Sequence, residues 1–284
     1  MDHPEQSPQP HLPPLSPDPT EPALAVRDLT KMFGDQTAVD RLSLDIPRGA
    51  LYGIVGPNGA GKTTMITLAT GLARPDAGRA WIAGHDVWAD PQPAKQSMGL
   101  LVDGIPVFDR LSGPEYLSYL GGLRRMDPAV VQERSTELLD ALGLTTAGDK
   151  RIVDYSAGMT KKILLAGALL HDPDVLILDE PLEAVDPVSG RLIQQILRDY
   201  ARRGGTVVLS SHVMELVEGL CDHVAIINDG RVLTAGHVDE VRRGRSLVDT
   251  FIGFVGGGQL QEGSLGWLRG GDRVDQNGLG EGRA

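Results

Sequence analysis

The 284-residue sequence lacks long apolar runs, a second cysteine and an excess of basic residues. Its longest apolar stretches, such as Ile163 to Leu165 and Val175 to Leu178, are far below the roughly 18 residues that suggest a membrane-spanning helix. A single cysteine, Cys221, cannot form an internal disulfide, so nothing indicates an oxidised, secreted protein. The formal net charge of -11 argues against a broad phosphate-binding surface, and we expect no nucleic-acid partner.

The start of the chain lacks the basic-then-apolar order of a secretory signal, which favours a cytoplasmic location. Eight of the 19 prolines fall within residues 1–22, where proline removes amide donors and blocks helix. We therefore predict a disordered or polyproline-like tail at 1–22. A compact domain is expected at 23–244, and the glycine-rich extension at 245–284 is predicted to be largely flexible.

Within the predicted domain, short apolar runs alternate with longer amphipathic stretches, which is typical of an α/β fold. Strands are expected at residues 24–29, 39–46, 51–55, 80–82, 175–178, 206–209, 224–227 and 231–234. Helices are expected at 62–70, 113–123, 128–142, 158–170, 187–202 and 212–220. The section at about 103–158 has helical spacing and almost no strand pattern, so it is predicted to be a helical lobe inserted into a sheet.

The strongest motif is a glycine-rich loop that follows the apolar strand at 51–55 and opens a helix. It meets the G-x-x-x-x-G-K-[ST] pattern with Gly56, Pro57, Asn58, Gly59, Ala60, Gly61, Lys62 and Thr63. Such a loop presents backbone amides and a helix N-terminus to phosphate oxygens. Lys62 would reach the outer phosphates, and the hydroxyl of Thr63 would hold Mg²⁺, with Thr64 next along the helix also at the nucleotide. The motif predicts ATP binding.

A second motif is the acidic pair Asp179 and Glu180, which ends the wholly apolar run at 175–178. Such a run predicts a central parallel strand, and in parallel sheets ligands gather at the carboxyl ends of the strands. Taken alone, the pair is more typical of a solvated strand end or a helix cap. Beside a phosphate loop, Asp179 is expected to serve the metal and Glu180 to activate water.

The order of these motifs resembles the ATPase domain of ABC transporters, from about Leu24 to Val255. The resemblance implies a P-loop NTPase core with a mixed sheet, an antiparallel β-subdomain and an inserted helical subdomain. It implies that Phe33 stacks on adenine and that His212 contacts the γ-phosphate. It also places Ser156 and Gly158 in the signature sequence and Asp186 at the end of the loop after Glu180.

Each of these matches also has a purely structural reading. Phe33 could be a core aromatic, and His212 could be an ordinary residue at the start of a helix. Ser156 could be a helix cap, although a capped helix N-terminus is itself suited to an anion, so both readings of Ser156 can hold. Cys221, Asp222 and His223 lack a second cluster with metal-ligand spacing and are expected to be structural.

The sequence departs from the family pattern at three places. Asp103 stands near the family's glutamine between sheet and helical lobe; it could still hold Mg²⁺. Ala157 and Met159 replace the usual signature glycine and glutamine. Leu182 replaces a small or hydroxylated residue.

The resemblance implies an ATPase that drives export through a separate transmembrane permease and works with a second ATPase subunit, as a homodimer or heterodimer. It would then be peripheral at the inner face of the cell membrane. One alternative is a soluble ABC ATPase that acts on the ribosome or on DNA. Another, raised by Asp103, is an inactive nucleotide-binding switch.

Overall fold

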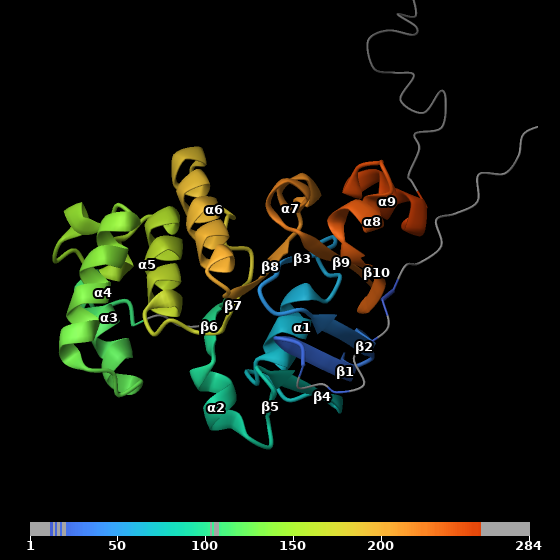
Figure 1. Ribbon diagram of the computed structural model, residues 1–284, viewed down its shortest axis with the longest axis horizontal. Coiled ribbons are helices and arrows are strands. Elements are labelled where there is room, and N and C mark those ends of the chain that lie inside the picture. Colours follow the sequence, from blue (N-terminus) through green and yellow to red (C-terminus); the bar gives the residue numbers. More distant parts are fainter. Residues whose placement is uncertain are drawn as a thin grey trace, which may run out of the picture.

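The computed structural model describes residues 12, 13, 15, 18, 21–102, 104 and 108–256. Two sheets and a helical lobe make up this part of the chain (Figure 1). The strands are β1 (Leu24–Phe33), β2 (Gln36–Ile46), β3 (Leu51–Val55), β4 (Ala77–Ile82), β5 (His85–Asp86), β6 (Met98–Leu101), β7 (Val175–Leu178), β8 (Thr206–Ser211), β9 (His223–Asn228) and β10 (Arg231–His237). The helices are α1 (Lys62–Ala69), α2 (Pro91–Gln96), α3 (Gly113–Leu123), α4 (Pro128–Ala141), α5 (Ala157–Leu169), α6 (Pro187–Arg202), α7 (Met214–Leu220), α8 (Val238–Arg242) and α9 (Leu247–Val255). Short 3-10 turns lie at Thr145–Ala147 and Ile152–Asp154.

The larger sheet has the strand order β10-β9-β3-β8-β7-β6. Strands β9 to β6 in that order are parallel, and β10 returns antiparallel to β9. Its central strands β3, β7 and β8 are buried on both faces, which explains the continuous apolar runs in the sequence. One face packs on α5, α6 and α7 and the other on α1 and the smaller sheet. The carboxyl ends of β3, β7 and β8 consequently share one edge.

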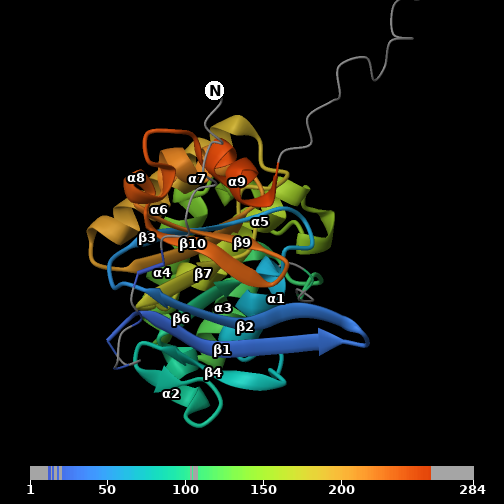
Figure 2. The same ribbon diagram turned by 90° about the vertical axis from the view of Figure 1, so that its right-hand side faces the viewer.

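The smaller sheet, β2-β1-β4-β5, is antiparallel and lies beside the first, as Figure 2 shows. Three backbone segments meet where it joins the larger sheet. A Cβ on Gly61 would come within 2.4 Å of the Ala38 carbonyl oxygen, and one on Gly230 within 2.8 Å of the same atom. The Gly230 amide donates to the Ala60 carbonyl at 2.9 Å, and the Gly230 carbonyl accepts from the Asp40 amide at 3.0 Å. Only glycine fits this junction at 61 and 230, where φ is also positive.

The helical lobe consists of α3, α4 and α5 and lies at the far end of the larger sheet from the smaller one (Figure 1). A capping box starts α3: the Ser112 and Glu115 side chains each bond the other residue's amide. Asp127 caps α4 by accepting from the Ala129 amide at 2.8 Å. Helices α3 and α4 fall within the section at about 103–158 where a helical lobe was expected, whereas α5 continues beyond it. The limits of the lobe stay a prediction.

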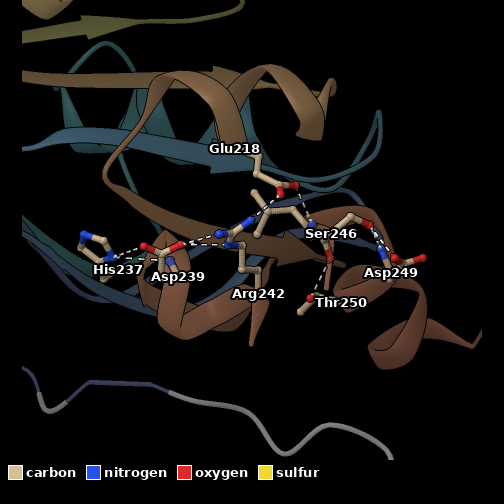
Figure 3. Close-up of polar contacts among 8 residues, drawn as sticks. Glu218, His237, Asp239, Arg242, Ser246, Asp249 and Thr250 are labelled. Carbon is tan, nitrogen blue, oxygen red and sulfur yellow. Dashed lines mark hydrogen bonds and ion pairs between the residues drawn. The ribbon is translucent and has the colours of Figure 1, made fainter. Parts of the chain in front are cut away.

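Helix α9 packs against α7, and α8 packs against β9, β10 and α9. A polar cluster joins the three helices (Figure 3). Glu218 on α7 accepts from the Leu247 amide at 3.0 Å and pairs with Arg242 at 3.2 Å. Ser246 caps α9 through the Asp249 amide, and Leu247 is fully buried. The folded chain therefore continues through α9, although the extension at 245–284 was predicted to be largely flexible. The domain limits at 22 and 244 stay predictions, and the rest of the extension, from 257, lies outside the described residues.

Most of the elements agree with their predicted ranges to within a few residues, and the differences are local. The helix expected from His212 begins at Met214, because the Ser211 hydroxyl accepts from the Val213 amide at 3.0 Å and turns the chain first. Strand β6, which runs parallel to β7, was not predicted. The short elements β5, α2, α8 and α9 also have no predicted counterpart. Within the described residues, every helix is too short or too polar to cross a bilayer.

Candidate ATP site

The phosphate loop connects β3 to α1 and closes against the turn between β9 and β10. A Cβ on Gly56 would come within 2.1 Å of the Ile227 carbonyl oxygen, so the first glycine is needed for the close approach. Gly59 and Gly61 have φ values of 82° and 98°, in the region that favours glycine. Gly61 is the N-cap of α1 and has no side-chain cap. The start of α1 can therefore offer its amides to an anion.

Lys62 lies within this loop and is only 6% exposed. Its Nζ donates to the carbonyl oxygens of Gly56 at 2.9 Å and Pro57 at 3.2 Å. The same atom is 3.8 Å from Oε1 of Glu180. The ammonium group is thus held at the mouth of the loop, with a carboxylate facing it.

The carboxyl end of β7 brings the acidic pair to the loop. Asp179 is 1% exposed and accepts from the hydroxyl of Ser210, at the end of the neighbouring strand β8. That hydroxyl also accepts from the Glu180 amide at 3.0 Å. Ser210 therefore fixes both acidic residues relative to β8.

His212 follows β8 and reaches the same carboxylate from the other side. Its Nδ1 lies 3.1 Å from Oε2 of Glu180, and its side chain is 39% exposed. Glu180 consequently faces Lys62 through one oxygen and His212 through the other. The imidazole is accessible from the cleft.

Phe33 ends β1 and is 58% exposed, so it is not a core residue. Its ring lies beneath Nζ of Lys31 at 5.7 Å from the ring centre. An exposed ring at the rim of a cleft is suited to stacking on a flat base.

These residues line one open cleft of about 430 Å³. Its lining includes ten of the residues expected at the nucleotide: Phe33, Asn58, Gly59, Gly61, Lys62, Thr63, Thr64, Asp179, Glu180 and His212. Gly56, Pro57 and Ala60 shape the loop from behind, and Ala60 is buried. Thr63 and Asp179 supply oxygen atoms, the donors that Mg²⁺ prefers, so the residues present fit a magnesium ion.

Ser156, Gly158 and Asp186 do not line the cleft. Ser156 caps α5 by accepting from the Met159 amide at 3.3 Å. Asp186 caps α6 and accepts from the amides of Val188 and Ser189, both at 3.0 Å. Hydrogen bonds from Ser189, side chain first and then backbone, lower the pKa of Asp186 below its ordinary value. Asp103 lies outside the described residues.

Two residues around Glu180 were not assigned a role from the sequence. Ser210 is fully buried between the ends of β7 and β8. A serine that ends an apolar strand is the only signal for it. Lys161 on α5 donates to the Glu180 carbonyl oxygen at 3.1 Å, and no spacing rule predicts that contact.

Comparison with known proteins identifies the family. The family model described as ABC transporter matches residues 39–183. The daunorubicin/doxorubicin resistance ATP-binding protein DrrA of Streptomyces peucetius is 36% identical over 225 residues, which cover 78% of this chain and 68% of that protein. The Nod factor export ATP-binding protein I of Cupriavidus metallidurans is 36% identical over 234 residues, 81% of this chain and 74% of that protein.

Solved structures agree on the fold. A structure of an ATP-binding subunit of an ABC transporter superposes with a TM-score of 0.76 at 26% identity and covers 81% of this chain and 98% of that one. An ATP-binding cassette in a dimeric post-hydrolysis state, bound to ADP and Pi, has a TM-score of 0.69 at 23% identity; it covers 76% of this chain and 98% of that one and shows the fold alone. The chain belongs to the ABC transporter family, as one of its ATP-binding and ATP-hydrolysing subunits.

Proposed function

We propose that this subunit powers export through a permease that is a separate chain, by closing with a second ATPase subunit around ATP and opening after hydrolysis. The observation that carries the proposal is the placement of Glu180 between Lys62 and His212 in the cleft of the phosphate loop. The names of the relatives, which include export and drug-resistance proteins, favour transport over a role on the ribosome or on DNA.

The phosphate loop and Phe33 bind and orient ATP. The amides at the start of α1 meet the phosphate oxygens, and Lys62 turns from its loop carbonyls toward the outer phosphates. Phe33 stacks on the base at the rim. This positioning lowers the barrier by holding the γ-phosphate in line with the attacking water.

Glu180 takes the proton. Its carboxylate orients a water and accepts a proton from it as the oxygen attacks the γ-phosphate. His212, 3.1 Å from that carboxylate, contacts the γ-phosphate when ATP is present and so senses its loss.

Thr63 and Asp179 would hold Mg²⁺, and Asp103 could join them. When bound, the ion would offset the negative charge of the phosphates. Ser210 keeps Asp179 in place through its hydroxyl hydrogen bond. Two oxygen ligands from the protein, with phosphate and water oxygens completing the shell, are typical of Mg²⁺.

A second subunit completes the site. Ser156 and Gly158 begin α5 outside the cleft of their own chain, and they meet the γ-phosphate held by the other subunit. Asp186 lies on the loop beside them: a Cβ added to Gly158 would be 4.0 Å from Cα of Val185, the residue before Asp186. Closure of the dimer is thus driven by contacts that exist only with ATP bound.

The permease contact lies on the helical lobe, and the ATPase is peripheral at the inner face of the membrane. The lobe and the segment leading to it expose Phe108, Tyr119 and Leu123, at 50%, 42% and 63%. The rings of Phe108 and Tyr119 meet edge to face, 4.7 Å apart. Exposed aromatic groups of this kind are enriched at protein interfaces.

Replacing Glu180 by glutamine tests the ATPase step. Glu180→Gln should keep ATP affinity within about twofold while slowing phosphate release by at least about 100-fold, because the amide cannot accept the proton. Glu133→Gln, an exposed carboxylate on α4, is the matched control and should hydrolyse normally. A normal rate in Glu180→Gln would remove Glu180 as the base.

Membrane fractionation tests the transport step. The chain is expressed with and without a candidate permease, a multi-span membrane protein from the same organism, and the membrane fraction is assayed for the ATPase. Association that requires the membrane protein supports the permease. An ATPase that stays in the supernatant in both cases, and sediments with ribosomes instead, would favour the soluble alternative.

A further inference from the structure

The main chain of Glu180 is held in an unfavourable conformation. Its φ is 46°, in the left-handed region that residues with a Cβ avoid. Ala184, at the other end of the following turn, has a φ of 58°. Backbone of this kind persists only where the surroundings hold it, and it is found preferentially at functional sites.

Hydrogen bonds to the amide and to the carbonyl oxygen of Glu180 keep its main chain in this conformation. Its amide donates to the Ser210 hydroxyl oxygen at 3.0 Å. Its carbonyl oxygen accepts from the Glu183 amide at 3.2 Å and from Nζ of Lys161 at 3.1 Å. The lysine contact is charge-assisted, which makes it stronger than an ordinary amide contact.

Lys161 reaches Glu180 from a different part of the fold. It lies in the second turn of α5, five residues after the cap Ser156, and it is half-buried. The start of the same helix packs on the turn after Glu180, because a Cβ on Gly158 would be 3.8 Å from the Ala184 carbonyl oxygen. Helix α5 therefore contacts this turn at two places.

The direction of the Glu180 carboxylate depends on this backbone. Oε1 and Oε2 lie 3.8 Å from Lys62 and 3.1 Å from His212. The φ of Glu180 sets the direction of its Cα–Cβ bond relative to β7, so a change in that φ would carry the carboxylate away from both. A displacement of about 1 Å in a catalytic group can lower a rate by about 100-fold. The carbonyl contact is thus a point from which the position of the carboxylate can be controlled.

We propose that Lys161 is a positioning residue that fixes the Glu180 backbone and joins it to the start of α5. When α5 closes on the nucleotide held by the second subunit, the same helix sets the water-activating carboxylate in its own cleft. The inference depends on the proposed role of Glu180, and it adds a route by which one site of the dimer acts on the other.

The first test compares three variants of the full-length chain. Lys161→Met should lower kcat about tenfold while the Kd for ATP stays within about twofold, because the carboxylate is displaced and the phosphate loop is intact. Lys161→Arg keeps a charged donor and should restore kcat to within about threefold of the original. Lys150→Met, an exposed lysine of the helical lobe, is the control and should change neither value.

The second test is a double-mutant cycle with Glu180→Gln, measured by single-turnover hydrolysis of radiolabelled ATP. If Lys161 acts through Glu180, adding Lys161→Met to Glu180→Gln should lower the residual rate by less than about twofold. A further tenfold loss would overturn the proposal, since Lys161 would then act elsewhere. Circular dichroism gives the folded fraction, and Lys161→Gln replaces Lys161→Met if the methionine variant does not fold.

The two proposals fail in different ways. Normal hydrolysis by Glu180→Gln overturns the role of Glu180 and the inference with it. Slow hydrolysis by Glu180→Gln, together with an unchanged kcat in Lys161→Met, overturns the inference alone.

Discussion

Two helix N-termini in this subunit are suited to phosphate, and they are built differently. Helix α1 starts at Gly61 with no side-chain cap, inside the cleft. Helix α5 starts at Ser156, whose side chain already accepts from the Met159 amide, outside that cleft. The first amides of an uncapped start are left to water or to a ligand, whereas a capped start already has one amide satisfied by its side chain. The first therefore suits primary binding of the nucleotide by one subunit, and the second suits a contact that is made and broken as the dimer closes and opens.

Removing the charge at the α1 start should have the largest effect. Lys62→Ala should lower phosphate release by at least about 100-fold and weaken ATP binding, because the outer phosphates lose the cation that faces them. Steady-state phosphate release and titration with a fluorescent ATP analogue measure the two effects. Lys150→Ala is the control, and unchanged turnover in Lys62→Ala would contradict the assignment of the loop.

Blocking the α5 start should stop turnover while leaving ATP binding to the monomer nearly intact. Ser156→Arg places a large cation where the second subunit is proposed to close, so ATP-dependent dimerisation should be lost in size-exclusion chromatography. Mixing Ser156→Arg with Lys62→Ala chains restores one complete site in each mixed dimer, and partial recovery of activity is expected. Tight ATP-dependent dimerisation of Ser156→Arg alone would rule this serine out of the interface.

Replacing one glycine by alanine should affect the free energy of unfolding differently in the phosphate loop before α1 and at the start of α5. Gly56→Ala should destabilise the fold by about 1–3 kcal/mol, because its Cβ would meet the Ile227 carbonyl oxygen at 2.1 Å. Gly158→Ala meets nothing closer than 3.8 Å and should stabilise the isolated chain by up to about 1 kcal/mol through helix propensity. Urea unfolding measures both, and a loss of ATPase in the stable Gly158→Ala variant would support closure at this residue.

The smallest effect is expected at a third helix start, where Asp186 caps α6. Replacing Asp186 should change how the free energy of unfolding depends on pH. The hydrogen bonds from Ser189 hold the pKa of Asp186 below its ordinary value of 3.8. Its contribution to the free energy of unfolding is thus present above pH 3.8 and is lost as the pH falls through the lowered value. Urea midpoints at pH 5 and pH 3 should differ less in Asp186→Asn than in the unchanged chain. Equal differences would contradict this.

The sequence predicted best where one local pattern decides the structure. The all-apolar run of β7 and the phosphate loop each imply their element, and both lie where they were expected. Strand β6 was missed because Met98–Leu101 is short and contains Gly99, whose Cβ would lie 2.1 Å from the Ala168 carbonyl oxygen. That glycine is explained only by packing against α5, which no local pattern contains.

Most residues that line the cleft follow motifs in the sequence, but the contacts that hold them in place do not. Lys62, Glu180 and His212 follow recognisable motifs, and the structure brings them together. The left-handed backbone of Glu180 and its contact with Lys161 depend on how α5 packs against a turn 19 residues away. Tertiary packing of this kind has no period or composition that could be recognised in advance.

The glycine junction of Ala38, Gly61 and Gly230 has a consequence for the rate at which ATP associates. Because the phosphate loop is held there by main-chain contacts, it is ordered before ATP arrives, and binding incurs little loss of conformational entropy in the loop. Association should then be limited by diffusion rather than by folding of the loop. The amide of Gly230, bonded to the Ala60 carbonyl, should exchange its hydrogen as slowly with ATP as without it.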